Sequence, residues 1–348
     1  MHLQSIWTAI SGNSVHSRNL SASGGRMTSI PSVSGRLVRL QPRGFTDSQL
    51  PRERSGNGAE SQMDQQEPPI IPRNLRFNLS KHATRHWLRG DVLQSAQIDC
   101  FSVFLPLGER YFIRSLKRFA PVVNDAELRH AIQDFCIQEA FHTREHEDYN
   151  QGLRALGYDV DGMEALGEGT LNKGFSPLVE LATTCAIEHI TTSFSTALLR
   201  NPALLDTAPA PYRRLWMWHA LEEIEHRAVA LAVLKAATPS MSAWSRYFFR
   251  TTVFSVVIIL FVATVTRCVR SYVRTDGVRT GLRFWLRYLW VVLVRPGFLG
   301  RLGLISFLRY YWPGYRATAR SYDALVLSGR RWLDCEMASD GGTPPTIG

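Results

Sequence analysis

Two short stretches set the architecture of this chain: Gln138-Glu139-Ala140-Phe141-His142 and Glu222-Glu223-Ile224-Glu225-His226. Each contains the pattern Glu-x-x-His in a segment whose apolar residues have helical spacing. Because residues i and i+3 lie on the same face of a helix, each stretch directs a carboxylate and an imidazole to one side. The two stretches therefore predict two helices whose polar faces meet inside the fold.

Two further glutamates stand in the order that a metal-binding bundle requires. Glu109 precedes the first stretch, and Glu188 lies between the two. One inward Glu from each of two helices, with a Glu-x-x-His from each of two others, is the ligand set of ferritin-like di-iron and di-manganese proteins. We therefore expect an all-α fold, a ferritin-like four-helix bundle with additional C-terminal apolar helices and a disordered N-terminal tail. The candidate metal ligands are Glu109, Glu139, His142, Glu188, Glu223 and His226.

Two more histidines lie on the same predicted helix faces as these ligands. His219 stands one turn before Glu223, so it is either a seventh ligand or a histidine of the core. His146 stands one turn after His142 and is a further candidate ligand, with a role in the core as the alternative. Both residues extend the polar stripe by one turn.

Two more glutamates near the predicted ligands have open roles. Metal-bound histidines usually donate their second ring N–H to an acceptor. Glu222 is either that acceptor for His142 or a solvent-exposed side chain. Glu180 precedes Glu188 and could supply the ligand of its helix instead.

The ligand types indicate two divalent first-row metal ions. Imidazole suits iron, and carboxylates suit iron and manganese, so iron is favoured, with manganese or zinc as alternatives. We expect Glu139 and Glu223 to bridge the two ions, and His142 and His226 to bind one ion each. Glu109 and Glu188 would be terminal ligands. A single Glu-x-x-His is common in charged helices, but four inward carboxylates would be very unfavourable without cations beside them.

Changes in composition along the chain divide it into four parts. Residues 1–70 are rich in Ser, Gly, Pro and Arg and are expected to be a disordered tail, and 337–348 a second one. The bundle is expected over 71–238, and an apolar, basic helical extension over 239–336. The helices expected in the bundle are 96–119, interrupted at Pro106 and Gly108, then 126–156, 177–199 and 212–237, with a polar loop over 158–173.

The predicted extension suggests contact with a membrane. Residues 251–266 carry no charge, but they are fewer than the about 20 needed to span a bilayer. A second apolar stretch, 282–294, contains Arg283 and Arg287 beside the aromatic residue types that favour membrane interfaces. The extension is thus a buried helix, a short or re-entrant membrane segment, or a helix at the membrane surface.

Charge and cysteine content limit the function classes. The formal net charge is +10, yet the chain has no zinc-finger, helix-turn-helix or RNA-recognition pattern, so we expect no nucleic-acid partner. Arginines beside apolar segments fit an anionic membrane surface better. The 5 cysteines lack a C-x-x-C pattern, which indicates a reducing, cytoplasmic location. The arginines and apolar segments add an expected association with a membrane. The absence of Asp and Glu before Gly44 leaves an organelle transit peptide as the alternative.

Three stretches resemble a bacterial family labelled "predicted metal-dependent hydrolases": Phe104-Leu-Pro-Leu-Gly-Glu-Arg-Tyr-Phe-Ile-Arg114, Gln138-Glu-Ala-Phe-His-Thr-Arg-Glu-His146 and Trp218-His-Ala-Leu-Glu-Glu-Ile-Glu-His226. The resemblance covers about 72–315. It departs after Tyr315, where Arg316-Ala-Thr stands in place of the family's His-Pro-Trp. The ligand pattern is also similar to that of di-iron arylamine N-oxygenases. That similarity implies a ferritin-like fold, oxygen activation at iron and a seventh ligand at His219, but no substrate.

Four functions remain in competition on the sequence alone. The favoured one is O2-dependent oxidation of a small, apolar substrate at a dinuclear iron centre, which would need an electron donor. The alternatives are a hydrolase that activates water between two metals, a non-enzymatic metal-binding protein, and a membrane or lipid interaction module with a vestigial site. A homo-oligomer is compatible with each of these.

Overall fold

The computed structural model describes residues 68–293, 301–317 and 322–338, and within these residues it contains helices and no strands. The prediction of an all-α fold is confirmed. Of the expected disordered tails, 1–70 and 337–348, residues 1–67 and 339–348 lie outside the described residues, while Met337 and Ala338 belong to the helix over Asp323–Ala338.

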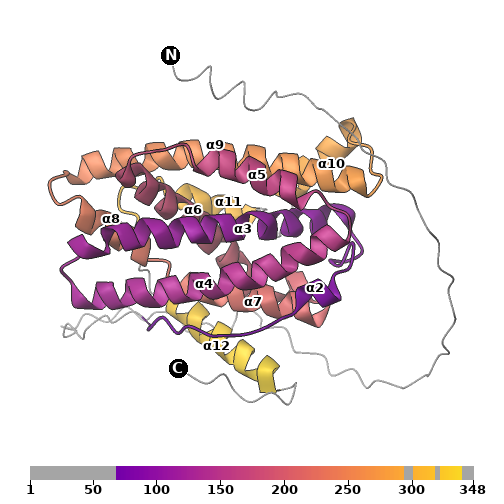
Figure 1. Cartoon of the computed structure of the whole chain (residues 1–348), viewed down its shortest axis with the longest axis horizontal. Coiled ribbons are helices and arrows are strands. Elements are labelled where there is room, and N and C mark those ends of the chain that lie inside the picture. The colour runs from indigo at the N-terminus through magenta and orange to yellow at the C-terminus, as the bar shows by residue number, and fades with distance from the viewer. Residues whose placement is uncertain (1–67, 294–300, 318–321, 339–348) are drawn as a thin grey trace, which may run out of the picture. The chain divides into compact units, whose positions relative to one another are not determined.

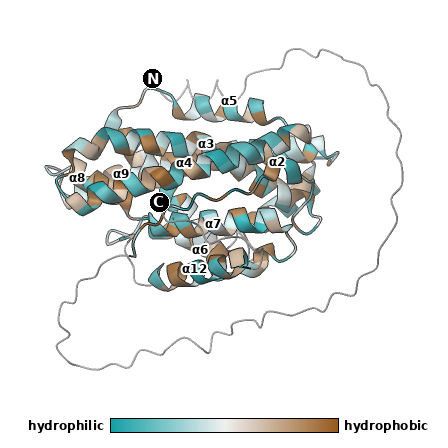
Figure 2. Cartoon of the chain, turned by 60° about the horizontal axis from the view of Figure 1, so that its bottom comes forward, coloured by the Kyte–Doolittle hydropathy of each residue, from teal (hydrophilic) through white to brown (hydrophobic). Residues whose placement is uncertain are grey.

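Four rods form the centre of the fold (Figure 1). They are α3 (Val92–Phe119), α4 (Ala126–Ala155), α6 (Pro177–Arg200) and the pair α7 (Ala210–Glu225) and α8 (Val229–Ala237). Helix α3 packs along α4 and against α6, and α6 packs along α7 and α8. Figure 2 shows hydrophobic and hydrophilic residues mixed around these helices, as amphipathic helices of a bundle require.

The expected interruption of the first bundle helix at Pro106 and Gly108 is wrong, because α3 is continuous from Val92 to Phe119. A proline inside a helix leaves the carbonyl four residues earlier without its helical donor. Here that carbonyl belongs to Ser102, and it accepts a hydrogen bond from the side-chain amide of Asn150 at 3.2 Å. The neighbouring helix α4 thus supplies the missing donor, and Glu109 lies in mid-helix.

The predicted polar loop over 158–173 is also wrong, since it contains helix α5 (Val160–Leu171), whose N-cap Asp159 accepts from the backbone N–H of Gly162. The last bundle helix is in two pieces instead of one. Helix α7 ends at Glu225, His226 is its C-cap residue, and α8 begins at Val229. The second Glu-x-x-His motif therefore ends at a break in the helix.

An extended arm precedes the bundle and passes through a single helical turn, α2 (Leu79–His82). Residues 68–78 have no regular structure, and α3 begins at Val92, earlier than the predicted start at residue 96. The backbone N–H of Phe77 donates to Glu145 at 2.9 Å. A Cβ atom at Gly152 would lie 2.8 Å from that of Ala83. The absence of a side chain at Gly152 therefore lets the arm approach α4 closely.

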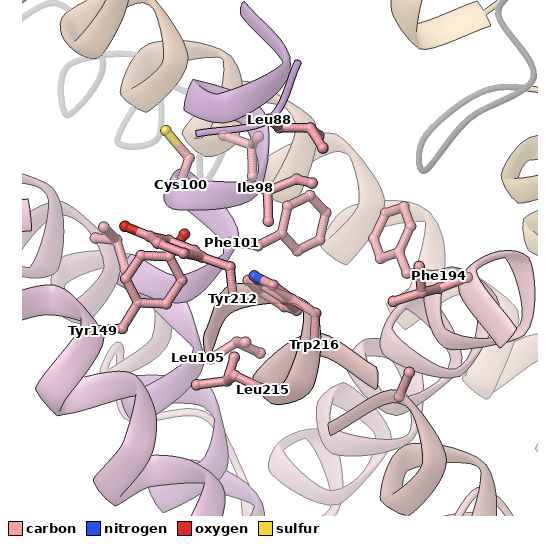
Figure 3. Packing of buried hydrophobic residues seen from close by; sticks show 14 of the residues in the cluster. Leu88, Ile98, Cys100, Phe101, Leu105, Tyr149, Phe194, Tyr212, Leu215 and Trp216 are labelled. Carbon is pink, nitrogen blue, oxygen red and sulfur yellow. The ribbon is translucent and has the colours of Figure 1, made fainter. Parts of the chain in front are cut away.

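Helices of the C-terminal part are α9 (Ala243–Thr275), α10 (Leu282–Leu293), α11 (Arg301–Arg309) and α12 (Asp323–Ala338). Helix α9 packs against α3 and α6, and α12 packs against α7. One hydrophobic cluster joins residues of α9 to residues of α3, α6 and α7. Figure 3 shows part of this cluster, in which Tyr149, Tyr212 and Trp216 lie close together beside Phe101 of α3. The domain boundary expected at residue 238 stays a prediction.

Candidate metal centre

All six predicted ligands are buried in the bundle. Glu109, Glu139, His142, Glu223 and His226 are each 0% exposed, and Glu188 is 2% exposed. Two overlapping groups of side chains place their ligand atoms within 4.8 Å of one another. The first group is Glu139, His142, Glu223 and His226, and the second is Glu109, His142 and His219. The structure therefore brings together residues from α3, α4 and α7, and His142 belongs to both groups.

The ligand atoms of this centre lack hydrogen-bond partners in the protein. No well-formed hydrogen bond reaches either carboxylate oxygen of Glu109, Glu139 and Glu223, nor Oε1 of Glu188, Nδ1 of His142 and Nε2 of His226. The one close approach among these atoms joins Nε2 of His226 and Oε1 of Glu139 as an ion pair at 3.1 Å. Buried polar atoms are almost always hydrogen-bonded, because an unpaired one costs about 1 to 3 kcal/mol. So many unpaired acceptors in one place fit cations, since a metal ion supplies the positive charge that each oxygen lacks.

The imidazole of His142 is oriented by Glu222. Nε2 of His142 lies 3.1 Å from Oε2 of Glu222, and the other oxygen of that carboxylate accepts from the indole N–H of Trp218 at 2.9 Å. Because a carboxylate can only accept, Nε2 carries a proton and Nδ1 faces the ligand group. Glu222 is 0% exposed, so the alternative of a solvent-exposed side chain is wrong.

His226 lies between carboxylates from two different helices. Its Nε2 is 3.1 Å from Oε1 of Glu139, and its Nδ1 is 3.2 Å from Oε2 of Glu188. Glu188 is in neither ligand group, and its contact with the centre runs through Nδ1 of His226. Glu180, the alternative to Glu188, lies 3.5 Å from Arg118 in a salt bridge and belongs to neither ligand group.

A hydrogen-bond chain determines which nitrogen of His219 faces the centre. The hydroxyl of Ser102 donates to Oδ1 of Asn150 at 3.0 Å, so its oxygen accepts from Nδ1 of His146 at 3.0 Å. Nε2 of His146 must then accept from Nδ1 of His219, 3.2 Å away. That leaves a lone pair on Nε2 of His219, which lies 3.3 Å from Glu223. His146 thus orients His219, and neither ligand group contains it.

The pKa values show that the centre favours positive charge. Burial and the neighbouring Glu139 raise the pKa of Glu109 well above its usual range. Burial and Glu188 raise that of Glu223 to about 8. Burial opposes the charge on His142, but Glu139 and Glu222 outweigh it and raise its pKa to about 10. Protons or metal cations can supply the charge that these carboxylates require.

The pKa values of His219 and His146 are lowered, in contrast to the raised pKa of His142. Burial, followed by the charge of His142, lowers the pKa of His219 and of His146 well below the usual value. Both rings are therefore neutral at physiological pH. A neutral imidazole is the form that binds metal, which agrees with the lone pair that the hydrogen-bond chain leaves on His219.

Beside the centre lie two more buried carboxylates, Glu222 and Glu225, together with the side chains that donate hydrogen bonds to them. We call this group the arm network: Arg73, Gln138, Glu222, Glu225 and Arg330. Arg73 donates to Oε1 of Glu225 at 2.8 Å and to Oε1 of Glu222 at 3.1 Å. Gln138 and Arg330 also donate to Glu225, at 3.0 and 2.8 Å. The sequence signalled Gln138 and Glu225 only by their position inside the two motifs, and nothing in it pointed to Arg73 or Arg330.

A pocket of about 290 Å³ lies next to the centre, between α3, α5, α6 and α9, and none of the described residues that line it is charged. Leu105 and Phe112, each about one turn from Glu109, contribute to its wall. A small cavity of about 20 Å³ is lined by His219 and shares Phe101, Leu105 and Thr191 with the pocket. The pocket under α9 and the small cavity at His219 are therefore two separate spaces that share part of their lining.

Comparison with known proteins agrees with this geometry. A family model described as "Predicted metal-dependent hydrolase" matches residues 71–318. The chain has no match among curated proteins and none among solved structures. The matched residues include every candidate ligand, so the family description and the buried Glu/His cluster both indicate metal dependence.

Proposed function

The chain belongs to the family of predicted metal-dependent hydrolases, and from that premise we propose that it is an enzyme with a dinuclear metal centre inside a ferritin-like bundle. One observation carries the proposal: buried carboxylate oxygens and ring nitrogens from separate helices converge without hydrogen-bond partners. The order of ligands along the chain, with one contribution from each rod, supports the comparison with ferritin-like carboxylate proteins.

The positions of the side chains support a division of roles. Glu139 and Glu223 are the carboxylates of the two Glu-x-x-His motifs and lie in one ligand group, so we assign them as the residues that would hold both ions. Glu109 and Glu188 lie on other helices and suit terminal positions. His142 presents Nδ1 to the first ion, and His219 presents Nε2 near Glu223 as a seventh ligand. His226 lies between Glu139 and Glu188 and suits the second ion.

We infer O2-dependent oxidation as the reaction and iron as the metal. When bound, a pair of iron ions would supply the chemistry of oxygen reduction, and an external electron donor would supply the electrons. The protein's own residues hold the ligands in place, exclude water and orient His142 through Glu222 and His219 through His146. Six Glu and His ligands from a helical bundle are the set found in carboxylate di-iron proteins.

The apolar pocket supports a substrate with little charge. Its described lining contains threonines and apolar residues, and Phe101 and Leu105 also line the separate small cavity at His219. Transfer of a charged molecule into such a space would carry a large desolvation cost. We therefore propose an apolar small molecule as the substrate.

Hydrolysis is the second candidate, because the family description names it. In that case two metal ions would activate a water molecule and stabilise the leaving group. The same residues would bind zinc or manganese, and the apolar pocket would hold the acyl portion of an ester.

Metal analysis of the purified chain separates the two reactions. Two irons per chain, with an absorption band that appears when the reduced protein meets oxygen, would support oxidation. Zinc or manganese without an oxygen response, together with cleavage of apolar esters, would support hydrolysis. A chain that binds no first-row metal after reconstitution, while it remains folded, would overturn both proposals.

A further inference from the structure

The longest helix, α9, exposes an apolar stripe to solvent. Most of its turns between residues 244 and 262 present a large hydrophobic side chain. The exposed fractions are 62% for Trp244, 60% for Phe248, 49% for Val256, 68% for Ile259 and 53% for Val262. Large exposed apolar patches usually mark contact surfaces, because water is expelled when they are covered.

We propose that this stripe rests on an anionic lipid bilayer, and that the pocket beneath α9 takes a long aliphatic chain from that bilayer to the metal centre. The first part stands on the surface of α9 alone. The second part rests on the proposed function, since it names the substrate class of the same centre. The occupant of the stripe is therefore lipid, and the occupant of the pocket is an acyl chain.

Charge complementarity favours lipid over a second protein chain. The exposed stripe continues toward the C-terminal end of α9 as Arg267, Arg270 and Arg274. From residue 243 to residue 317 the sequence contains 12 arginines and only one acidic residue, Asp276. A basic residue near an anionic leaflet contributes about 1 kcal/mol, and an apolar stripe beside such residues is typical of interfacial helices.

Helix α9 would lie in the plane of the membrane surface. It is long and apolar enough to cross a bilayer, and only 22% of its most apolar window is buried. Its other face, however, packs on α3 and α6 through Phe254, Val265, Val269 and Tyr272. Those two helices carry Glu109 and Glu188, so a crossing would draw the bundle itself into the hydrocarbon, at a large cost in desolvation.

The pocket opens on the same side as the stripe. Val256 belongs to both, since it is 49% exposed and lines the pocket. Phe175, at 43% exposed, lines the pocket from the segment that follows α5. An aliphatic chain that leaves the bilayer at Val256 can therefore enter the pocket without crossing water.

The interior of the pocket suits a slender chain. Its volume of about 290 Å³ lies at the lower end of the range for small-molecule sites, and its described walls are apolar apart from threonines. The separate small cavity lined by His219 holds only about 20 Å³. A bulky ring system would not pass the side chains that line both spaces, Phe101, Leu105 and Thr191, whereas the end of a slender chain would need only a small movement of them to reach the ligand group.

Vesicle flotation tests the contact with lipid. The full chain is mixed with vesicles of phosphatidylcholine and phosphatidylglycerol, or of phosphatidylcholine alone, and we expect it to float with the former. Ile259→Glu places a charge on the stripe and should weaken binding at least about tenfold. Ile137→Glu is the matched control, because Ile137 is 44% exposed on α4, and it should bind as the native chain does. Equal binding of both variants would overturn the proposal.

The arginines provide an independent test. Replacing Arg267, Arg270 and Arg274 together by Gln should weaken binding to the anionic vesicles by about a hundredfold. The control replaces Arg110, Arg114 and Arg118, which are exposed on α3 with similar spacing, and should have little effect. Binding that survives both high salt and alkaline extraction would show a spanning helix and overturn the in-plane arrangement. If the chain self-associates and Ile259→Glu abolishes that self-association, the stripe contacts a second copy of the chain, and the lipid proposal is overturned.

Binding of a fluorescent fatty acid tests the pocket. Val256→Trp fills the opening and should reduce fatty-acid binding about tenfold, whereas Val262→Trp, exposed on the same helix but outside the pocket lining, should not. Equal loss in both variants would overturn the pocket as the chain site. Glu223→Gln should retain vesicle and fatty-acid binding while losing metal. Metal content therefore tests the proposed metal chemistry, whereas vesicle and fatty-acid binding test the lipid proposal, and each can fail without the other.

Discussion

The two sides of α7 carry buried carboxylates in opposite states. On one side, Glu222 and Glu225 accept hydrogen bonds from Arg73, and Glu225 also accepts from Gln138 and Arg330. On the other side, both oxygens of Glu223 lack any hydrogen-bond partner. A carboxylate surrounded by donors holds the fold together, whereas one that is buried without donors needs a cation. The comparison separates glutamates that are already paired with donors from one that could hold a metal ion, on a single helix.

The largest effect is expected from Glu223→Gln. The neutral amide cannot bridge two cations, so metal content should fall below two ions per chain and activity at least about a hundredfold. The metal-free variant should be no less stable than the metal-free native chain, because a buried carboxylate without a donor is removed. Metal analysis and thermal melting in chelator measure both. Glu145→Gln, a buried carboxylate outside the centre, should retain metal; if it also loses metal, the distinction fails.

Arg73→Ala should produce the reverse result. Removing this guanidinium leaves Glu222 and Glu225 buried with fewer donors, which should lower the free energy of unfolding by about 3 to 5 kcal/mol. Denaturant unfolding of the metal-free chain measures this. The control is Arg76→Ala, in the same arm, whose side chain is 60% exposed where it meets Glu145 at 3.4 Å. Such a pair contributes at most about 1 kcal/mol. Equal losses would show that the arm network does not stabilise the fold.

Asp99 is a third kind of buried carboxylate, partnered by neutral donors. It accepts from Tyr149 at 2.6 Å and from Trp87 at 2.8 Å, yet burial outweighs these bonds and raises its pKa to about 7. Between about pH 4 and 7 the folded chain therefore binds more protons than the unfolded chain, so stability should fall as pH rises through this window, by roughly 4 kcal/mol. Asp99→Asn should remove that slope in denaturant titrations at several pH values; an unchanged slope would contradict it.

The smallest effect is expected from Glu222→Gln, because Glu222 contacts both the arm network and the centre. This carboxylate belongs to the arm network through Arg73 and to the centre through Nε2 of His142. In Glu222→Gln an amide N–H would face Nε2, and the ring would then carry its proton on Nδ1, away from the productive form. Metal affinity should fall about 10- to 100-fold. Competition with a chelator measures it, and affinity equal to that of Glu145→Gln would contradict the orienting role.

Much of the helical fold was predictable because helix signals are local. Asp125 caps α4 by accepting from the backbone N–H groups of Glu127 and Leu128, as its position before an amphipathic run predicts. The continuity of α3 through Pro106 was not predictable, because the compensating donor is Asn150, on another helix. The break at His226 and the helix over 160–171 were not predicted either. The local sequence favours neither outcome strongly there, so the packing of the helices decides the backbone conformation.

The sequence by itself determined that Glu139 and His142 share one helix face and that Glu223 and His226 do so on another helix, because Glu-x-x-His spacing has this effect whatever surrounds the helix. Only the tertiary structure decided which ring nitrogen of His142 and of His219 faces the centre, and which glutamates are already neutralised by Arg73. These properties depend on hydrogen bonds between residues far apart in the chain, such as Arg73 and Glu225, 152 positions apart. Such contacts exist only once the helices have packed.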